Sequence, residues 1–209
     1  MAKARSIVAA EHDAMLEGLR DEALFVALGR IVDARDSSTE GHCQRLSLYA
    51  TALGATMNLP EADLDALYRG GLLHDIGKIA IPDRVLLKRG RLTAREYELM
   101  KCHPTIGDEL CSTVPSLDLV RPIVRHHHER LDGRGYPDGL AGDQIPLLAQ
   151  IVTIVDVFDA LTTDRPYRRA MSTARAYATL HAESRAGVYS PELADRFVEL
   201  HRSGALDQM

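Results

Sequence analysis

Apolar side chains recur at a helical spacing along most of the chain. Two such groups are Leu24, Ala27, Leu28, Ile31 and Val32, and then Leu46, Tyr49, Ala50, Leu53 and Met57. Because an α-helix turns once in about 3.6 residues, side chains three and four positions apart share one face. The pattern therefore predicts an all-α protein with one domain over residues 21–209, preceded by a helical lead-in over residues 1–20.

Capping signals predict where several helices begin. Pro60 suits the first turn of the helix that leads to the His74 region. Thr93 and Glu96 form a capping box, in which each side chain satisfies a free backbone N–H of the first turn. Ser190 before Pro191 predicts another helix start.

Three segments depart from this simple pattern. Residues 151–155 are β-branched and typical of a buried strand. A longer window fits the helical period better, through Leu147, Leu148, Ile151, Ile154, Val155, Phe158 and Leu161. We therefore expect a buried helix there. Residues 79–92 and 132–143 are expected to be loops, the second because it holds four glycines and Pro137.

Composition and charge narrow the class of protein. The 209 residues are 45% hydrophobic and 26% charged, which is typical of a globular domain with one core. The formal net charge of −5 disfavours a general nucleic-acid binder, because such proteins carry a basic excess. No apolar run is long enough to span a bilayer and no signal-peptide pattern opens the chain, so we expect a cytoplasmic protein. Cys43, Cys102 and Cys111 form no CxxC pair and indicate no disulfide framework.

Histidine is the informative residue type. Six of the nine histidines lie close together in the sequence: His42, His74, His103, His126, His127 and His128. The pairs His74–Asp75 and His127–His128 interrupt apolar helical surroundings, as do Asp156 and Asp159. Several buried charges need a cation among them, and imidazole with carboxylate suits Fe, Mn or Zn. Adjacent residues on a helix diverge by about 100°, so two such pairs indicate two metal ions better than one.

Each of these residues also has an ordinary structural interpretation. We interpret the lone histidines His12, His181 and His201 as surface or capping residues without a role in the site. His103 alone would mark a helix start, the aspartate pair alone would be helix surface, and His126 is interpreted as structural. Only their occurrence together favours a metal centre.

Several longer motifs resemble the HD-GYP family. His74-Asp75-Ile76-Gly77-Lys78 is similar to the metal motif of the HD superfamily, and residues 127–137 (HHERLDGRGYP) are similar to the HD-GYP signature. Further matches follow in order at residues 81–83 (IPD), 139–142 (GLAG), 145–146 (IP), 156–162 (DVFDALT) and 165–168 (RPYR). The resemblance covers about residues 25–200, and motifs of this length in this order are far more specific than a lone His-Asp dipeptide.

The resemblance implies a helical HD-superfamily domain with a glycine-rich GYP loop. The implied activity is hydrolysis of cyclic di-GMP to pGpG and, in some members, on to GMP. Two metal sites would share Asp75; one adds His42, His74 and Asp156, and the other adds His103, His127 and His128. The implied cofactor is two divalent ions per chain, Fe first and Mn second, with a bridging hydroxide as the nucleophile.

Four other side chains have expected roles at such a site, and the resemblance implies those of Arg165 and Arg168. Lys78 would join His74 and Asp75 as a catalytic residue by steadying a phosphate oxygen; otherwise it is an exposed helix-end lysine. Arg165 and Arg168 would meet the phosphate or guanine of the substrate through their planar donor forks; otherwise they are surface arginines. Tyr136 would stack on a base or line the pocket.

The chain departs from the family pattern at three points. Ser38 stands where members with a third metal carry a glutamate, so we predict two metals. Gln150 stands where the family often has arginine, and its effect is open. Only some 20 residues precede the domain, where members usually carry a sensory domain. The chain therefore acts alone, is regulated by a partner such as a diguanylate-cyclase-type signalling protein, or is a fragment.

Three functions stay open. The leading one is a cyclic di-GMP phosphodiesterase. The second is a hydrolase of another cyclic dinucleotide such as cyclic GMP-AMP, because metal ions recognise phosphate and not the base. The third is a signalling module that binds a cyclic dinucleotide or a protein without turnover. A nucleic-acid polymer is the least favoured substrate, since no basic stripe with interleaved aromatic residues is present. The oligomeric state is left open.

Overall fold

The computed structural model describes residues 22–36, 41–164 and 169–208, and this part of the chain is helical without a β-strand. A helix over residues 22–36 comes first. The further α-helices are α2 (His42–Thr56), α3 (Glu61–Leu73), α4 (Asp83–Leu86), α5 (Ala94–Met100), α6 (His103–Cys111), α7 (Arg121–His126), α8 (Leu147–Thr162), α9 (Thr173–Arg185) and α10 (Pro191–Arg202). Short 3-10 helices are η1 (Ile76–Ala80), η2 (Pro115–Leu117), η3 (Gly142–Gln144) and η4 (Ala205–Gln208). The all-α prediction is confirmed.

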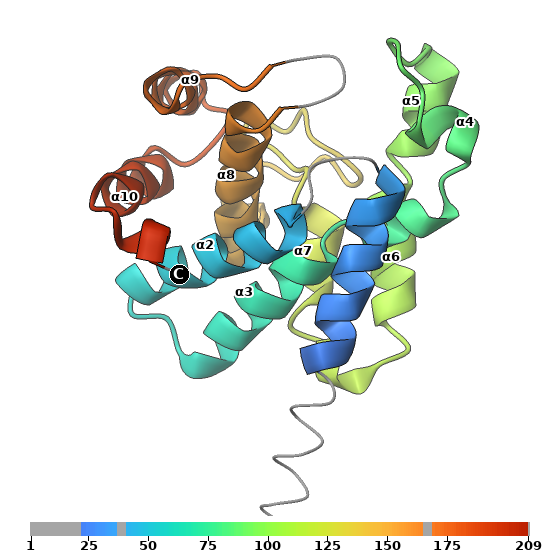
Figure 1. Ribbon diagram of the computed structural model, residues 1–209, viewed down its shortest axis with the longest axis horizontal. Helices are drawn as coiled ribbons and strands as arrows, with labels where there is room; N and C mark the ends of the chain where they lie inside the picture. The colour runs from blue at the N-terminus through green and yellow to red at the C-terminus, as the bar shows by residue number, and fades with distance from the viewer. Residues whose placement is uncertain (1–21, 37–40, 165–168, 209) are drawn as a thin grey trace, which may run out of the picture.

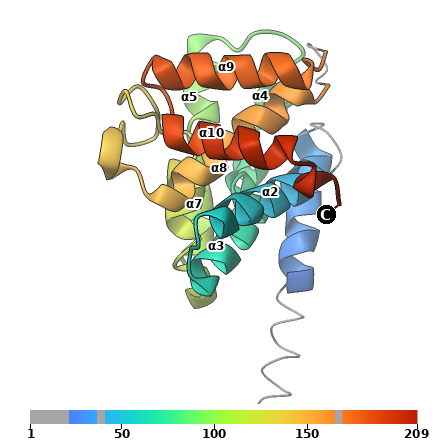
Figure 2. The ribbon, with the colours of Figure 1, turned by 90° about the vertical axis from the view of Figure 1, so that its left-hand side faces the viewer.

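Helix α8 is the centre of the packing. It contacts α2, α3 and α7 as well as α9 and α10 (Figure 1). The pair α9 and α10 covers one side of α8, and the view turned by 90° shows α10 lying between α9 and α2 (Figure 2). Helices α4 and α5 lie at the opposite end of the molecule, beyond α6 (Figure 1).

The sequence of α8 explains its central place. Its residues from Ile151 to Val155 are all buried, and Phe158 one turn later is also buried. A helix that is apolar on most of its faces is stable only where neighbours surround it. The prediction of a buried helix over a strand is therefore confirmed for this segment.

The predicted capping signals act as expected. Thr93 accepts a hydrogen bond from the backbone N–H of Glu96, and the Glu96 carboxylate accepts the N–H of Thr93 in return. Ser190 accepts from the N–H of Leu193 at the start of α10, and Pro60 stands directly before α3.

The prediction of a loop over residues 79–92 is partly wrong. The segment begins within η1 and contains the one-turn helix α4. Val85 and Leu86 in α4 are buried with Ile81, and Met100 and Ile106 pack against them as a small second core. This packing stabilises a helix too short to show a period in the sequence. The glycine-rich loop is confirmed up to residue 141, with η3 at its end.

Two glycines allow close contacts that position the candidate site. A Cβ atom on Gly71 of α3 would come within 2.4 Å of the Cα atom of Ser47 in α2. A Cβ atom on Gly77 of η1 would come within 2.0 Å of the carbonyl oxygen of His103 in α6. Only glycine fits at these two crossings, which bring α2, α3, η1 and α6 together.

Several predictions fall on residues outside the described ranges. They are the helical lead-in over residues 1–20, His12, Ser38, Arg165 and Arg168. Among the described residues, no helix has the length and apolar character needed to cross a membrane.

Candidate metal centre

The seven predicted ligands come from separate parts of the fold. They are His42 at the start of α2, His74 and Asp75 after α3, His103 at the start of α6, His127 and His128 after α7, and Asp156 in α8. Six of them form two groups with ligand atoms within 4.8 Å of one another: Asp75 with His103, His127 and His128, and Asp75 with His42 and His74. Asp156 adjoins the second group, with Oδ1 3.6 Å from Nε2 of His42. The structure thus brings the seven side chains together as two groups that share Asp75.

Asp75 presents one oxygen to each group. Its Oδ2 atom lies 3.2 Å from Nε2 of His74. Its Oδ1 atom lies 3.1 Å from Nε2 of His103 and 3.8 Å from Nε2 of His127. A carboxylate with its two oxygens directed this way is suited to bridge two cations.

Three of the histidines are oriented by the ends of the helices that precede them. The Nδ1–H groups of His74, His103 and His127 donate to the carbonyl oxygens three residues earlier, at 2.9, 2.8 and 2.9 Å. The last carbonyls of a helix lack a partner within the helix, so these bonds satisfy them. Where a ring is neutral, these bonds place its proton on Nδ1 and leave the Nε2 lone pair directed into the site.

The atoms that face the centre of the site lack hydrogen-bond partners. Nε2 of His103, Nε2 of His127 and Oδ1 of Asp75 are buried and unsatisfied. Lone pairs this close repel one another, and buried polar atoms without a partner destabilise the fold. A cation between them would satisfy all three atoms. The donor set of imidazole and carboxylate therefore fits a pair of divalent transition-metal ions.

His42 is held in a different way from the other histidines. Its Nδ1 atom lies 2.7 Å from Oδ2 of the buried Asp159. Arg45 donates to both oxygens of Asp159, at 2.8 and 3.1 Å. Burial alone would raise the pKa of Asp159, but His42 and Arg45 outweigh it and lower the pKa to about 2. Asp159 is therefore an ionised partner that orients His42.

The sequence motifs assign no role to Asp159. The signal was its position one turn after Asp156, with Arg45 likewise one turn after His42. The two turns face each other only because α2 packs against α8, which the sequence alone does not show.

Lys78 is not an exposed helix-end lysine. Its Nζ atom lies 2.7 Å from Oδ2 of Asp75 and 2.6 Å from Oδ2 of Asp36. Burial alone would lower the pKa of Lys78, but the two carboxylates outweigh it and raise the pKa. The ammonium group is therefore charged at neutral pH and lies beside the oxygen of Asp75 that faces His74.

The charges of the site are strongly coupled. Burial would lower the pKa of His74, but Asp75 and Asp156 outweigh it and raise the pKa to about 9. Burial would raise the pKa of Asp75, but Lys78 and His74 hold it well below its usual range. Burial lowers the pKa of His127 and His128, which keeps both rings neutral, as metal ligands must be.

Tyr136 lies next to the group that contains His128. Its ring centroid is 4.8 Å from that of His128 and 6.4 Å from that of His103. The buried carboxylate of Glu129 accepts the backbone N–H groups of residues 138, 139 and 140. These bonds fasten the glycine-rich loop, and with it Tyr136, beside the site.

His126 lies outside both groups. Its Nδ1 atom is 3.5 Å from Oδ2 of Asp138, and with Glu129 these side chains form a third acidic and imidazole cluster. Glu129 is already occupied by the loop, and Arg125 donates to both oxygens of Asp138. The two carboxylates of this cluster therefore have hydrogen-bond partners without a metal ion.

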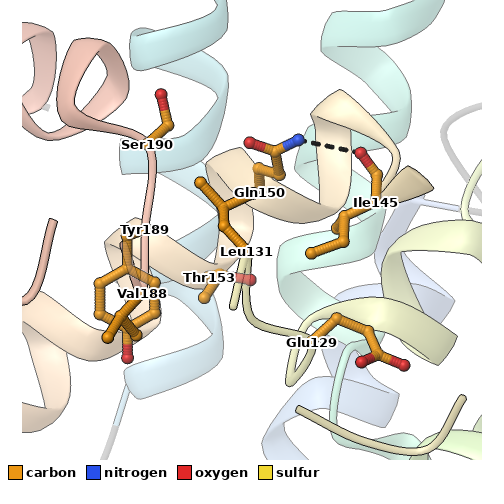
Figure 3. A pocket seen from close by; sticks show the side chains of 8 residues that line it. All are labelled: Glu129, Leu131, Ile145, Gln150, Thr153, Val188, Tyr189 and Ser190. Atoms are coloured by element: carbon orange, nitrogen blue, oxygen red, sulfur yellow. Dashed lines mark hydrogen bonds between the residues drawn. The ribbon is translucent and has the colours of Figure 1, made fainter. Parts of the chain in front are cut away.

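Gln150 lines a small pocket that holds none of the predicted ligands (Figure 3). Its side-chain N–H donates to the carbonyl oxygen of Ile145 at 2.9 Å. The pocket has a volume of about 10 Å³, which is room for a single water molecule. Gln150 thus forms part of the wall of this pocket, together with Thr153 and Tyr189.

An all-helical domain with two His/Asp groups around a shared carboxylate is the kind of scaffold that holds a dinuclear metal centre. The chain belongs to the HD domain family, whose profile matches residues 27–193. This match confirms the resemblance inferred from the motifs.

Two curated relatives share much of the sequence. The cyclic di-GMP phosphodiesterase response regulator RpfG of Xanthomonas campestris is 42% identical over 178 residues, which are 84% of this chain and 47% of that protein. The 3'3'-cGAMP-specific phosphodiesterase 3 of Vibrio cholerae is 36% identical over 159 residues, 76% of this chain and 35% of that protein. The chain therefore spans half or less of the length of these relatives.

A solved structure confirms the fold. A cyclic GMP-AMP-specific phosphodiesterase of V. cholerae matches 90% of this chain and 50% of its own chain, with a TM-score of 0.71. At 20% identity this likeness shows the helical architecture alone.

Proposed function

We propose that the chain is the catalytic domain of a metal-dependent phosphodiesterase that hydrolyses cyclic di-GMP to pGpG, and on to GMP if the linear product can rebind. The observation that carries the proposal is the pair of His/Asp groups that share Asp75. The names of the two relatives support a cyclic dinucleotide as the class of substrate.

The proposed cofactor is two divalent ions per chain, with Fe preferred and Mn second. His42, His74, Asp75 and Asp156 would hold one ion, and Asp75, His103, His127 and His128 the other. When bound, two such ions would lower the pKa of a water molecule and neutralise charge that develops on the phosphoryl oxygens.

Lys78 is the proposed catalytic residue outside the ligand set. Its charged ammonium group, held by Asp36 and Asp75, is suited to donate to a phosphate oxygen as negative charge develops there. His74 and Asp75 would act by holding the ions. The proposed substrate contacts are Tyr136, beside His128, together with Arg165 and Arg168, whose positions lie outside the described residues.

A second candidate substrate is 3'3'-cGAMP. The observation that favours it is the 36% identity to the V. cholerae phosphodiesterase named for that substrate. Because metal ions bind phosphate, the choice between the two dinucleotides depends on the residues that contact the bases.

The experiment that tests the proposal is anaerobic turnover. Protein loaded with Fe(II) or Mn(II) is given cyclic di-GMP or 3'3'-cGAMP, and the linear products are separated by chromatography. We expect pGpG from cyclic di-GMP and no product from the His74→Ala variant. If protein that holds two ions per chain hydrolyses neither substrate, the proposed phosphodiesterase activity is refuted and a binding module is favoured.

A further inference from the structure

A cavity of about 300 Å³ lies beside the candidate metal centre. Its walls come from α5, the start of α6 and the glycine-rich loop, through Glu98, Lys101, Cys102, Ile106, Tyr136 and Pro137. Tyr136 also lies against His128, and Cys102 directly precedes His103. The cavity therefore adjoins the group that contains His103 and His128.

The lining of the cavity combines flat apolar walls with a pair of charges. Ile106, Pro137 and the ring of Tyr136 are the apolar part. Glu98 and Lys101 pair through Oε1 and Nζ at 2.8 Å, and the Glu98 side chain is 68% exposed. The volume is at the lower end of the range for ligand pockets, which is about 300–1,000 Å³. Such a cavity suits part of a dinucleotide, such as one base, better than the whole molecule.

The two charges match the polar edge of guanine. Guanine presents two N–H donors side by side, which a carboxylate accepts together, and next to them a carbonyl oxygen, which an ammonium group can contact. Adenine presents an acceptor where guanine has the first of these donors, so it would leave Glu98 facing a lone pair. Aromatic rings such as that of Tyr136 provide a stacking surface that any base can use.

We propose that this cavity binds a guanine base of the cyclic dinucleotide that is cleaved at the centre, with Glu98 and Lys101 as the residues that select guanine over adenine. The proposal rests on the proposed function and adds a specificity site to it.

A substrate with two different bases should be cleaved mainly at one of its two phosphodiester groups. Hydrolysis adds one water across a P–O3′ bond, so 3'3'-cGAMP can give two linear isomers, pGpA and pApG. If guanine must occupy the cavity, only one of the two phosphodiester groups reaches the metal centre. We therefore expect one isomer to exceed the other by about tenfold, the factor that a hydrogen-bonded charged group typically contributes.

The test compares Glu98→Ala with Glu109→Ala, which removes an exposed glutamate of α6 that does not line the cavity. For Glu98→Ala we expect KM for cyclic di-GMP to rise about tenfold with kcat nearly unchanged, because base contacts are the same in the ground and transition states. The two isomers from 3'3'-cGAMP should then form in similar amounts. Glu109→Ala should behave as the unmodified protein does.

A second measurement uses the exposed thiol in the cavity wall. Cys102 is exposed whereas Cys43 and Cys111 are buried, so a maleimide should modify Cys102 selectively. A bulky adduct there should raise KM for cyclic di-GMP while the metal content stays at two ions per chain.

The outcomes separate the two proposals. If the unmodified protein turns over cyclic di-GMP but neither Glu98→Ala nor the Cys102 adduct changes KM, the guanine site is refuted and the phosphodiesterase stands. If metal-loaded protein hydrolyses no cyclic dinucleotide, the proposed function itself fails.

Discussion

At the level of single residues, the candidate site depends on the partner that each histidine Nδ1 atom contacts. Three of the rings donate Nδ1–H to a helix-end carbonyl, whereas His42 pairs with the Asp159 carboxylate. A carboxylate partner makes an imidazole a stronger metal ligand than a carbonyl partner does. The two proposed metal positions are therefore chemically different.

This difference predicts the effect of Asp159→Asn. The variant keeps the shape of the side chain but removes the charge that His42 and Arg45 face. We expect the affinity for one of the two ions to fall by roughly 10- to 100-fold while the other ion stays bound. Titration of metal-free protein with Mn(II) in a calorimeter measures both affinities.

Asp108→Asn is the matched control for that titration. Asp108 is also a largely buried carboxylate, but its ion pairs go to Arg121 and Arg125. An equal loss of affinity for both ions in Asp159→Asn, or the same loss of affinity in Asp108→Asn, would contradict a specific role for Asp159.

The raised pKa of His74 predicts how the stability of the metal-free protein depends on pH. With a folded pKa of about 9 and an ordinary value of 6.5, the folded protein keeps a proton that the unfolded chain loses between these values. The free energy of unfolding should therefore be highest below pH 6.5 and fall, on the order of 3 kcal/mol, as pH rises toward 9. Urea unfolding at a series of pH values measures this change.

The His74→Ala variant should lose this pH dependence. Bound metal needs the unprotonated ring, so metal affinity of the unmodified protein should rise over the same pH window. Stability that increases between pH 6.5 and 9 would contradict the proposed charge state of His74.

At the scale of elements, the site depends on close crossings of helices. η1 approaches α6 so tightly that a Cβ atom on Gly77 would clash with the backbone of His103 and Gly107. Rotating a side chain cannot relieve such a clash. The backbone of η1, which follows Asp75, must therefore move away from the backbone of α6, which begins at His103.

We therefore expect Gly77→Ala to destabilise the protein by about 1–3 kcal/mol and to weaken metal binding. Gly90→Ala is the control, because no atom lies within 4 Å of a Cβ atom placed there. Chemical denaturation and a metal titration of both variants check this prediction. Gly77→Ala with unchanged stability and metal binding would show that the crossing does not position the site.

Elements with strong local signals could be predicted from the sequence. The capping box at Thr93 and the apolar period of α8 specify their own structure. Helix α4 could not be predicted, because it is one turn long and depends on packing with Met100 and Ile106. The surroundings of Lys78 could not be predicted either, since Asp36 is 42 residues away in the chain.

At the scale of the whole molecule, the candidate centre joins the parts of the fold. The predicted ligands come from α2, the ends of α3 and α7, the start of α6, and α8. The motifs made it possible to predict these ligands, but the sequence did not show how Asp75 divides its two oxygens between the groups. A regulatory or diguanylate-cyclase-type partner remains a prediction. The match to RpfG covers 47% of the length of that protein.

A centre that joins five segments should stabilise the entire fold when metal binds. An ion present at about 1,000 times its dissociation constant adds about 4 kcal/mol to the free energy of unfolding. For a protein of this size that corresponds to a rise in Tm of roughly 8–16 °C. Calorimetry with and without a chelator measures the shift. If the Tm of the unmodified protein is the same with and without metal, the prediction is contradicted. His74→Ala should show little of this shift.

Asp75 is proposed to join two metal ions in one centre, and electron paramagnetic resonance of the Mn(II)-loaded protein tests this bridging role. We expect two Mn per chain whose spins are coupled through the shared carboxylate, and loss of both the coupling and the bound metal in Asp75→Ala. One Mn per chain, or two uncoupled ions that persist in Asp75→Ala, would contradict it.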